Sequence, residues 1–288
     1  MRKPPARYEA APRRKHLRFP EGVRLVVHAI VNVEDWHLDA RLPRTVLSAP
    51  TGAEPVPDVA NWSWYQYGMR VGIWRLFDVL SPQRGHVTLA LNAEVCASYA
   101  PIVEEAVRSG WEMMGHGFYQ RPATLVEDER AMIRETLATI ERATTTRPRG
   151  WLGPGLVETW ETLAILASEG LTYCCDWGPA DDLPFELAAG ATTLLAVPYP
   201  IEMNDIVIYG LEKRPDDEIF ERGKRYFDVL YRESEGQAKI MPIALHPWIT
   251  GMPNRIGALD ELLRYVRAKP GVAFMSGGEI VDWYRGCA

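Results

Sequence analysis

The sequence has few cysteines and no long hydrophobic run. Its 288 residues include four cysteines; Cys174 and Cys175 are adjacent, Cys96 and Cys287 stand alone, and the spacing matches no zinc pattern. No stretch approaches the ~18 consecutive apolar residues of a membrane span, and no internal repeat or low-complexity tract is present. These absences exclude a disulfide scaffold and a membrane-spanning protein, and they indicate the reduced thiols of a cytosolic protein.

Charge is distributed unevenly along the chain. The net charge is −6, but residues 1–20 contain seven basic residues and one acidic residue, a charge of +6, which leaves 25 basic and 37 acidic residues, or −12, in the remainder. The basic segment lacks the apolar run of a signal peptide, and its prolines oppose an amphipathic helix. We interpret residues 1–22 as an arm on its own acidic body or on a neighbouring subunit, or else as a frayed terminus. We expect a cytoplasmic protein with no nucleic-acid or membrane partner.

Apolar runs of strand length alternate with segments of helical period. We expect strands at 25–33, 86–91, 111–115, 171–175, 193–197, 206–209, 240–245 and 272–275. We expect helices at 65–80, 98–109, 126–143, 158–168, 216–233, 256–268 and 279–284. This alternation predicts βα units around a mainly parallel sheet, and about seven such units is the number of a barrel. No linker divides the chain, so we predict one α/β domain over residues 23–288.

The longest irregular segment, residues 37–64, lies between the first expected strand and the first expected helix. Connections of this length are uncommon in compact domains and are usually functional or disordered. In a βα barrel this one belongs to the face that carries active sites. Its aromatic end, with Trp62 and Trp64, could form a lid or a stacking wall, or it could plug the barrel mouth or form a subunit contact.

Polar side chains follow three of the expected strands. Asn32 and Glu34 share one face of the first strand, which would direct an amide and a carboxylate into the barrel mouth. His116 follows the third strand between glycines, which allow close approach of the backbone to a ligand. His246 follows the seventh strand, before a proline. Two of six histidines thus occupy equivalent positions, where a general acid or base is expected, although each could simply cap its strand.

Two further places carry polar or aromatic residues. Arg149 begins a glycine-rich turn from strand to helix that includes Trp151 and Pro154. Asp176 and Trp177 follow the expected strand 171–175. A carboxylate in this position could orient a histidine or an arginine by accepting its hydrogen bond, whereas we expect Trp177 to pack.

Taken in order, these five places resemble the motifs of the polysaccharide deacetylase (NodB-homology) family. That pattern is an acidic pair after the first strand, His-x-x-x-His, an Arg/Pro turn, Asp/Trp, and Leu-His near the end. The resemblance covers about residues 24–285 and implies a distorted (β/α)₇ TIM-like barrel. The Asn-x-Glu strand end, Gly-Trp-Leu-x-Pro-Gly and Asp-Trp look most like the branch with metal-independent bacterial allantoinases and related cyclic-amide hydrolases.

The resemblance leaves two alignments of the acidic motif open. Either Glu34 matches the second carboxylate of Asp-x-Asp, with Asn32 in place of the first, or Glu34 and Asp35 form an adjacent pair. Gln120 stands where the second histidine of His-x-x-x-His is expected, and an amide oxygen is a poor ligand for zinc. We therefore expect no required cofactor, or one weakly bound divalent metal such as zinc, with Glu34, Asp35 and His116 as candidate ligands.

The activity that the resemblance implies is hydrolysis of the carbon–nitrogen bond of an amide. Glu34 or Asp35 would orient or deprotonate the attacking water, His246 would protonate the leaving nitrogen, and His116 would polarise the carbonyl. The roles of the two histidines could be exchanged. The residues expected to bind substrate are Asn32, Trp62, Trp64, Tyr119, Gln120, Arg149, Trp151, Pro154, Asp176, Trp177 and Trp248.

The expected substrate is a small soluble molecule, because we find no export signal that would take the protein to a cell-wall polymer. Our first choice is the ring opening of a hydantoin-like or imide-like cyclic amide. The alternative is N-deacetylation of a sugar or oligosaccharide, in carbohydrate metabolism, with Trp62 and Trp64 as stacking platforms. The missing second histidine also leaves open a barrel that binds a ligand without catalysis. We further expect a homo-oligomer.

Overall fold

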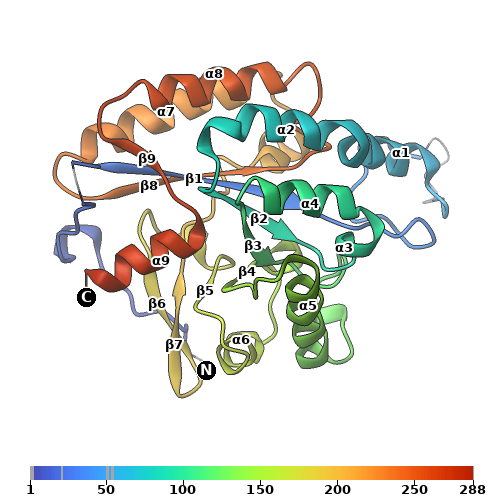
Figure 1. Ribbon diagram of the computed structural model, residues 1–288, viewed down its shortest axis with the longest axis horizontal. Helices are drawn as coiled ribbons and strands as arrows, with labels where there is room; N and C mark the ends of the chain where they lie inside the picture. The colour runs from blue at the N-terminus through green and yellow to red at the C-terminus, as the bar shows by residue number, and fades with distance from the viewer. Residues whose placement is uncertain (1–2, 21, 50–51, 53–54, 288) are drawn as a thin grey trace.

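The computed structural model describes residues 3–20, 22–49, 52 and 55–287. Its centre is a curled sheet with the strand order β6-β7-β5-β4-β3-β2-β1-β8, in which every neighbouring pair is parallel except β6 and β7 (Figure 1). The parallel strands are β1 (Leu25–Val33), β2 (Val87–Leu91), β3 (Glu112–Gly115), β4 (Gly150–Trp151), β5 (Tyr173–Cys174), β7 (Thr192–Ala196) and β8 (Lys239–Leu245). These strands confirm the expected α/β fold, a distorted (β/α)₇ barrel.

The barrel is distorted where β7 and β8 would meet. The two strands do not pair, and the chain that follows β7 passes along β8, with an isolated bridge between Asn204 and Ala244. Strand β6 (Phe185–Ala189) forms an antiparallel hairpin with β7, and β9 (Val272–Phe274) pairs with the start of β1. Because β9 and β2 pair with successive parts of β1, the other side of the barrel is also irregular.

Helices surround this sheet in Figure 1. The α-helices are α1 (Val59–Tyr67), α2 (Ile73–Leu80), α3 (Val95–Ser98), α4 (Ala100–Arg108), α5 (Glu129–Thr144), α6 (Thr162–Ser168), α7 (Glu218–Glu233), α8 (Ile256–Arg267) and α9 (Gly277–Gly286). The π-helices are η2 (Gly68–Gly72) and η7 (Ile206–Leu211), and the 3-10 helices are η1 (Ala11–Arg13), η3 (Ser81–Gln83), η4 (Ala123–Leu125), η5 (Pro154–Leu156) and η6 (Gly178–Ala180). Side chains cap the N-termini of two helices. The Asp128 carboxylate accepts a hydrogen bond from Ala131 N at the start of α5, and Ser276 and Glu279 form a capping box at the start of α9.

Strand β1 is buried along its whole length, and its side chains alternate between two layers. Val27, Val31 and Val33 pack outward in the core between sheet and helices. Val26 and Ile30 pack with the inner cluster of the barrel. Burying an aliphatic side chain of this size contributes about 1.5–3 kcal/mol, so the strand cannot shift its register by one residue. The alternation places Asn32 on the inner face, as the sequence predicted.

Several expected elements differ from the structure. The expected strand 206–209 is the π-helix η7, because a short apolar run does not distinguish a strand from a buried helical segment. The expected helix 65–80 is interrupted by η2, where a Cβ on Gly72 would lie 2.1 Å from the carbonyl oxygen of Pro247. The expected helix 158–168 begins at Thr162. The short strands β4 and β6 were not predicted.

The described part of the basic arm, residues 3–20, lies on the protein's own body. Ala188 N donates to Pro5 O at 2.8 Å, Ala238 N donates to Leu17 O at 2.9 Å, and Arg14 forms an ion pair with Asp181. These contacts support the first of the alternatives for the arm. A contact with a neighbouring subunit stays a prediction.

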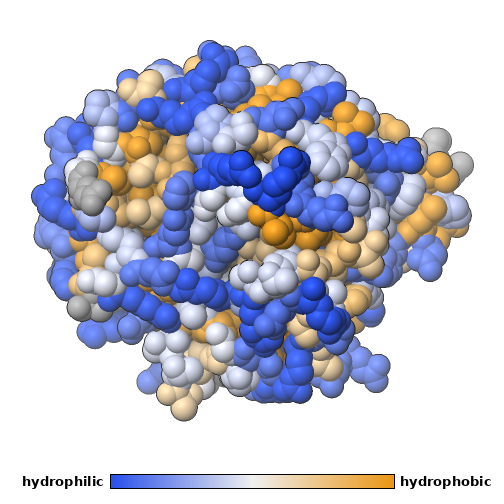
Figure 2. All heavy atoms as spheres, in the orientation of Figure 1, coloured by the Kyte–Doolittle hydropathy of each residue, from blue (hydrophilic) through white to orange (hydrophobic). Residues whose placement is uncertain are grey.

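The surface and the cysteines agree with the composition. On the face shown in Figure 2, hydrophilic side chains predominate and hydrophobic ones form separate patches, one of them at the edge where α1 lies. Among the described residues, no helix is both long and apolar enough to cross a bilayer. All four cysteines are free thiols.

Candidate active site

The carboxyl ends of three parallel strands bring Glu34, His116 and His246 together. Glu34 follows β1, His116 follows β3 and His246 follows β8, and parallel strands present their carboxyl ends at one edge of the sheet. Glu34 Oε1 lies 3.8 Å from His116 Nε2 and 3.7 Å from His246 Nε2. All three side chains line a cavity of about 900 Å³. The sequence therefore identified the three titratable groups that meet at its floor.

The Glu34 carboxylate is buried and held in place by two N–H donors. Trp36 Nε1 donates to Oε2 at 2.6 Å, and Gln120 Nε2 donates to Oε1 at 2.9 Å. Burial alone would raise the pKa of Glu34, but the interaction with His116, the charge of His246 and the hydrogen bond from Trp36 lower it below its usual value. Glu34 is therefore an anion at neutral pH.

His246 is paired with a buried carboxylate that the sequence did not reveal. Its Nδ1 lies 2.6 Å from Asp205 Oδ1, while Asp205 Oδ2 accepts from His246 N at 2.7 Å and from Thr250 Oγ1 at 2.6 Å. Burial lowers the pKa of His246, but the charge and hydrogen bond of Asp205, together with Glu34, outweigh it, so the pKa lies above its usual value. Asp205 stands just before η7, and the misassigned strand at 206–209 concealed its position.

His116 is oriented by backbone carbonyl and glycine contacts. Its Nδ1 lies 2.6 Å from Leu152 O, which directs Nε2 toward Glu34. Gly117 has φ +77°, and a Cβ there would lie 2.8 Å from Pro154 Cγ; a Cβ on Gly115 would lie 2.8 Å from the Trp151 ring. The flanking glycines therefore admit neighbouring protein groups rather than a ligand, which corrects our interpretation of them.

Five of the residues predicted to bind substrate line the cavity: Asn32, Tyr119, Gln120, Pro154 and Trp248. Asn32 Nδ2 donates to Leu245 O, and Tyr199, which was not predicted, donates its hydroxyl to Asn32 Oδ1 at 3.3 Å. The Trp248 indole N–H is buried and has no hydrogen-bond partner in the described part of the chain. The Trp248 ring therefore contributes packing to the cavity wall, with its centroid 5.1 Å from that of His246.

Asp35, Trp62 and Trp64 are not part of the cavity wall. Burial raises the pKa of Asp35, whose Oδ2 has no hydrogen-bond partner among the described residues. Trp62 Nε1 donates to Trp36 O at 3.4 Å, and the Trp64 ring packs edge-on against Trp248 at 4.9 Å between centroids. Glu34 is thus the carboxylate of the pair that faces the cavity, and the two tryptophans pack behind its wall instead of stacking on a ligand.

Arg149 and Trp151 also lie away from the cavity, which corrects their predicted role. Arg149 precedes the two-residue strand β4 and forms two hydrogen bonds to the Asp282 carboxylate on α9. Because the carboxyl ends of the strands form the cavity, a residue at the amino end of β4 cannot reach it. Trp151 is buried in the core with Leu137 and Leu166.

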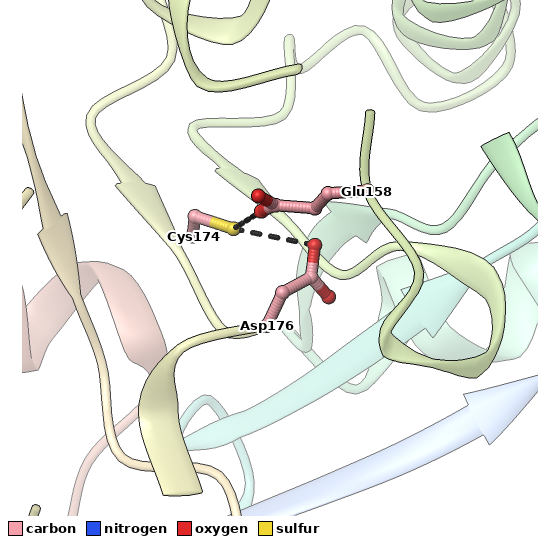
Figure 3. A group of neighbouring side chains, drawn as sticks. All are labelled: Glu158, Cys174 and Asp176. Carbon is pink, nitrogen blue, oxygen red and sulfur yellow. Dashed lines mark hydrogen bonds between the residues drawn. The ribbon is translucent and has the colours of Figure 1, made fainter. Parts of the chain in front are cut away.

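Asp176 belongs to a second polar group with Glu158 and Cys174 (Figure 3), and neither Asp176 nor Trp177 lines the cavity. Cys174 Sγ lies 3.5 Å from Glu158 Oε1 and 3.4 Å from Asp176 Oδ2, and Trp177 Nε1 donates to Glu158 Oε2 at 2.9 Å. Burial and the neighbouring carboxylate raise the pKa of Asp176 well above its usual value. Its other oxygen accepts from Gly153 N at 2.7 Å. Asp176 therefore positions the loop of the cavity wall and orients neither histidine.

Side chains that can ligate a metal ion gather at two places, and only one of the two sets suits a metal ion. The thiol sulfur of Cys174 and carboxyl oxygens of Glu158 and Asp176 lie within 4.8 Å of one another, and zinc accepts this set of residue types as ligands. At the cavity floor, both Glu34 oxygens already accept hydrogen bonds from N–H groups. Gln120 turns its NH₂ group toward Glu34, where an oxygen or nitrogen lone pair would be needed to ligate a metal ion. The residues around Glu34 and His116 thus do not fit a metal ion, and we derive no step through one.

Comparisons with known proteins agree with this fold. No family model matches the chain. A curated protein of Schizosaccharomyces pombe that is named after the polysaccharide deacetylases is 28% identical over 283 residues, covering 88% of each chain. The structure of PuuE allantoinase matches with a TM-score of 0.83 and 24% identity over 95% of this chain and 94% of that one. A Pseudomonas aeruginosa PAO1 structure, also named after the polysaccharide deacetylases, matches with a TM-score of 0.84 and 25% identity over 95% of both chains.

Sequence and fold therefore agree on the resemblance inferred from the motifs. The chain is similar to polysaccharide deacetylases in sequence and in fold.

Proposed function

We propose that this protein is a hydrolase of amide carbon–nitrogen bonds and that it opens the ring of a small cyclic amide of the hydantoin or imide type. The observation that carries the proposal is the anionic Glu34 carboxylate between two histidine Nε2 atoms at the floor of a cavity. A volume of about 900 Å³ is within the range of sites that enclose small molecules. The similarity to PuuE allantoinase supports this class of substrate.

Glu34 acts as the base. Its Oε1 is 3.7 and 3.8 Å from the two histidine nitrogens, so a water molecule or a substrate oxygen on the cavity side of these atoms can contact the carboxylate and a histidine together. The donors Trp36 and Gln120 keep the carboxylate ionised and fix its orientation. The water proton passes to Glu34 while the water oxygen forms the new bond to the carbonyl carbon.

His246 acts as the acid. Asp205 accepts the hydrogen bond of Nδ1 and stabilises the imidazolium, so Nε2 carries the proton that the leaving nitrogen needs. His116 donates its Nδ1–H to the Leu152 carbonyl, so it is the doubly protonated ring that donates Nε2–H to the substrate carbonyl and polarises it. When the C–N bond breaks, the His246 proton goes to nitrogen, and the proton held by Glu34 restores the starting state through solvent.

N-deacetylation of a sugar derivative is the second candidate. The names of the S. pombe and P. aeruginosa relatives favour it. The tryptophans that would have formed a stacking platform are not in the cavity wall, which favours the cyclic amide. We retain a cytoplasmic location and a homo-oligomer as further proposals.

A turnover assay on a panel of cyclic amides and N-acetyl sugars tests the proposal. Glu34→Gln and His246→Gln are each expected to lower kcat for ring opening by roughly 10²–10⁴-fold with the fold retained. Glu135→Gln and His86→Gln are matched controls, since both side chains are exposed and lie outside the cavity. Activity on N-acetyl sugars alone would establish the second candidate, and turnover that survives both active-site substitutions would refute the mechanism.

A further inference from the structure

The cavity carries positive charge although the body of the protein is acidic. Arg41 and Arg44, from the segment after β1, and Arg121, from the segment after β3, line it. Among the described residues that line the cavity, Glu34 is the sole carboxylate. Arg44, Arg121 and a histidine with a raised pKa thus share the described part of the cavity wall with one carboxylate, within a body of residues 21–288 whose net charge is −12.

Two of these arginines lack a carboxylate partner within the described part of the chain. Arg44 is exposed and has no ion pair or hydrogen bond there. Arg121 donates to the Tyr119 hydroxyl at 2.9 Å and forms no ion pair with a described residue. Arginines at other places pair with acidic side chains: Arg149 with Asp282, Arg222 with Glu212 and Arg255 with Asp216 are examples. Arg44 and Arg121 therefore have guanidinium donors available to a ligand.

Arg44 lines the same cavity as the reacting groups, so one ligand can extend from one to the other. Among the influences on the pKa of His246, burial lowers it most, Asp205 raises it, and the charge of Arg44 lowers it. Arg44 and His246 both line the cavity. Other parts of the wall are apolar, with Leu125, Leu156, Ile201 and Val207 among the lining residues.

We propose that the substrate amide carries a carboxylate, which Arg44 and Arg121 bind while the amide lies against Glu34 and His246. This inference rests on the proposed function and narrows its substrate class. A guanidinium offers a planar pair of N–H donors that matches a carboxylate, and such charge-assisted hydrogen bonds are about twice as strong as neutral ones. The cavity is also much larger than a five-membered ring requires, so a side chain with an acidic end has space.

The test compares a cyclic amide bearing a carboxylate side chain with its methyl ester, on wild type, Arg44→Gln and Arg121→Gln. Wild type should prefer the carboxylate at least about tenfold in kcat/KM, and each substitution should raise KM for it about tenfold, equal to about 1.4 kcal/mol. Turnover of the ester should change less than about twofold. Arg225→Gln is the control, because it removes the same charge from an 81% exposed side chain on α7.

The outcomes separate the inference from the proposed function. Equal kcat/KM for acid and ester, or equal effects of Arg44→Gln on both, overturns the inference and leaves ring opening intact. If neither compound is hydrolysed, calorimetric titration with the acid decides: binding that Arg44→Gln weakens and Arg225→Gln does not supports the anion site while the proposed function fails. Binding that neither substitution weakens overturns the anion site as well.

Discussion

Asp205→Asn tests the part of the site that the tertiary structure added. The carboxylate accepts hydrogen bonds from His246 Nδ1, His246 N and Thr250 Oγ1, at 2.6, 2.7 and 2.6 Å. An amide has one oxygen and one NH₂ group, so one orientation places NH₂ against Nδ1 and imposes the wrong tautomer. The other orientation places NH₂ against the His246 backbone N–H. Either way the imidazolium loses the negative charge that stabilises it.

The expected effects are large. Removing the carboxylate behind a catalytic histidine lowers kcat by roughly 10²–10⁴-fold. Hydrogen bonds to charged groups contribute about 1.5–3 kcal/mol each, so we expect the free energy of unfolding to fall by about 2–4 kcal/mol. A histidine with a raised pKa in the folded state stabilises the protein fully below its unfolded pKa near 6.5, and this stability is lost as the pH rises through the folded value. The variant should lose that contribution.

Histidine NMR titration and the pH dependence of kcat measure these effects. In Asp205→Asn, the pKa of His246 should fall and the basic limb of kcat should move to lower pH. Thr250→Val is the control, because it removes one hydrogen bond to Asp205 but keeps its charge, and the basic limb should stay in place. A folded Asp205→Asn protein with an unchanged His246 pKa and kcat within about threefold of wild type would refute the reasoning.

Further predictions concern pH, the base, metal and packing. Because the pKa of Glu34 lies below its usual 4.5 and that of His246 above 6.5, a profile of kcat should be flat between these values; a limb inside this range would contradict the assignments. Glu34→Gln should lower kcat by roughly 10²–10⁴-fold with a smaller change in KM, as steady-state kinetics would show. Dialysis against a chelator should leave turnover within about twofold, and elemental analysis before and after would expose a required metal. Gly72→Ala should destabilise the protein by about 1–3 kcal/mol in urea unfolding, whereas Gly257→Ala, with no atom within 4 Å of the added Cβ, should not.

The strand pattern of the sequence located the floor of the site. Glu34, His116 and His246 each follow an apolar run, and such runs become buried parallel strands whose carboxyl ends meet at one edge. Both the runs and the position of a polar residue after them are local features. The sequence alone therefore predicted the fold class and the three titratable groups.

Which other residues reach the three titratable groups depends on the path of the loops and on how the barrel closes. Asp205 reaches His246 because the segment after β7 passes along β8, and a short apolar run beside it does not reveal whether the backbone is helical or extended. Arg149 fails to reach the cavity because β4 has two residues and Arg149 stands at its amino end. Local periodicity determines which face a side chain takes along a strand. The distances between residues far apart in sequence follow from strand order and loop path, which the tertiary structure alone decides.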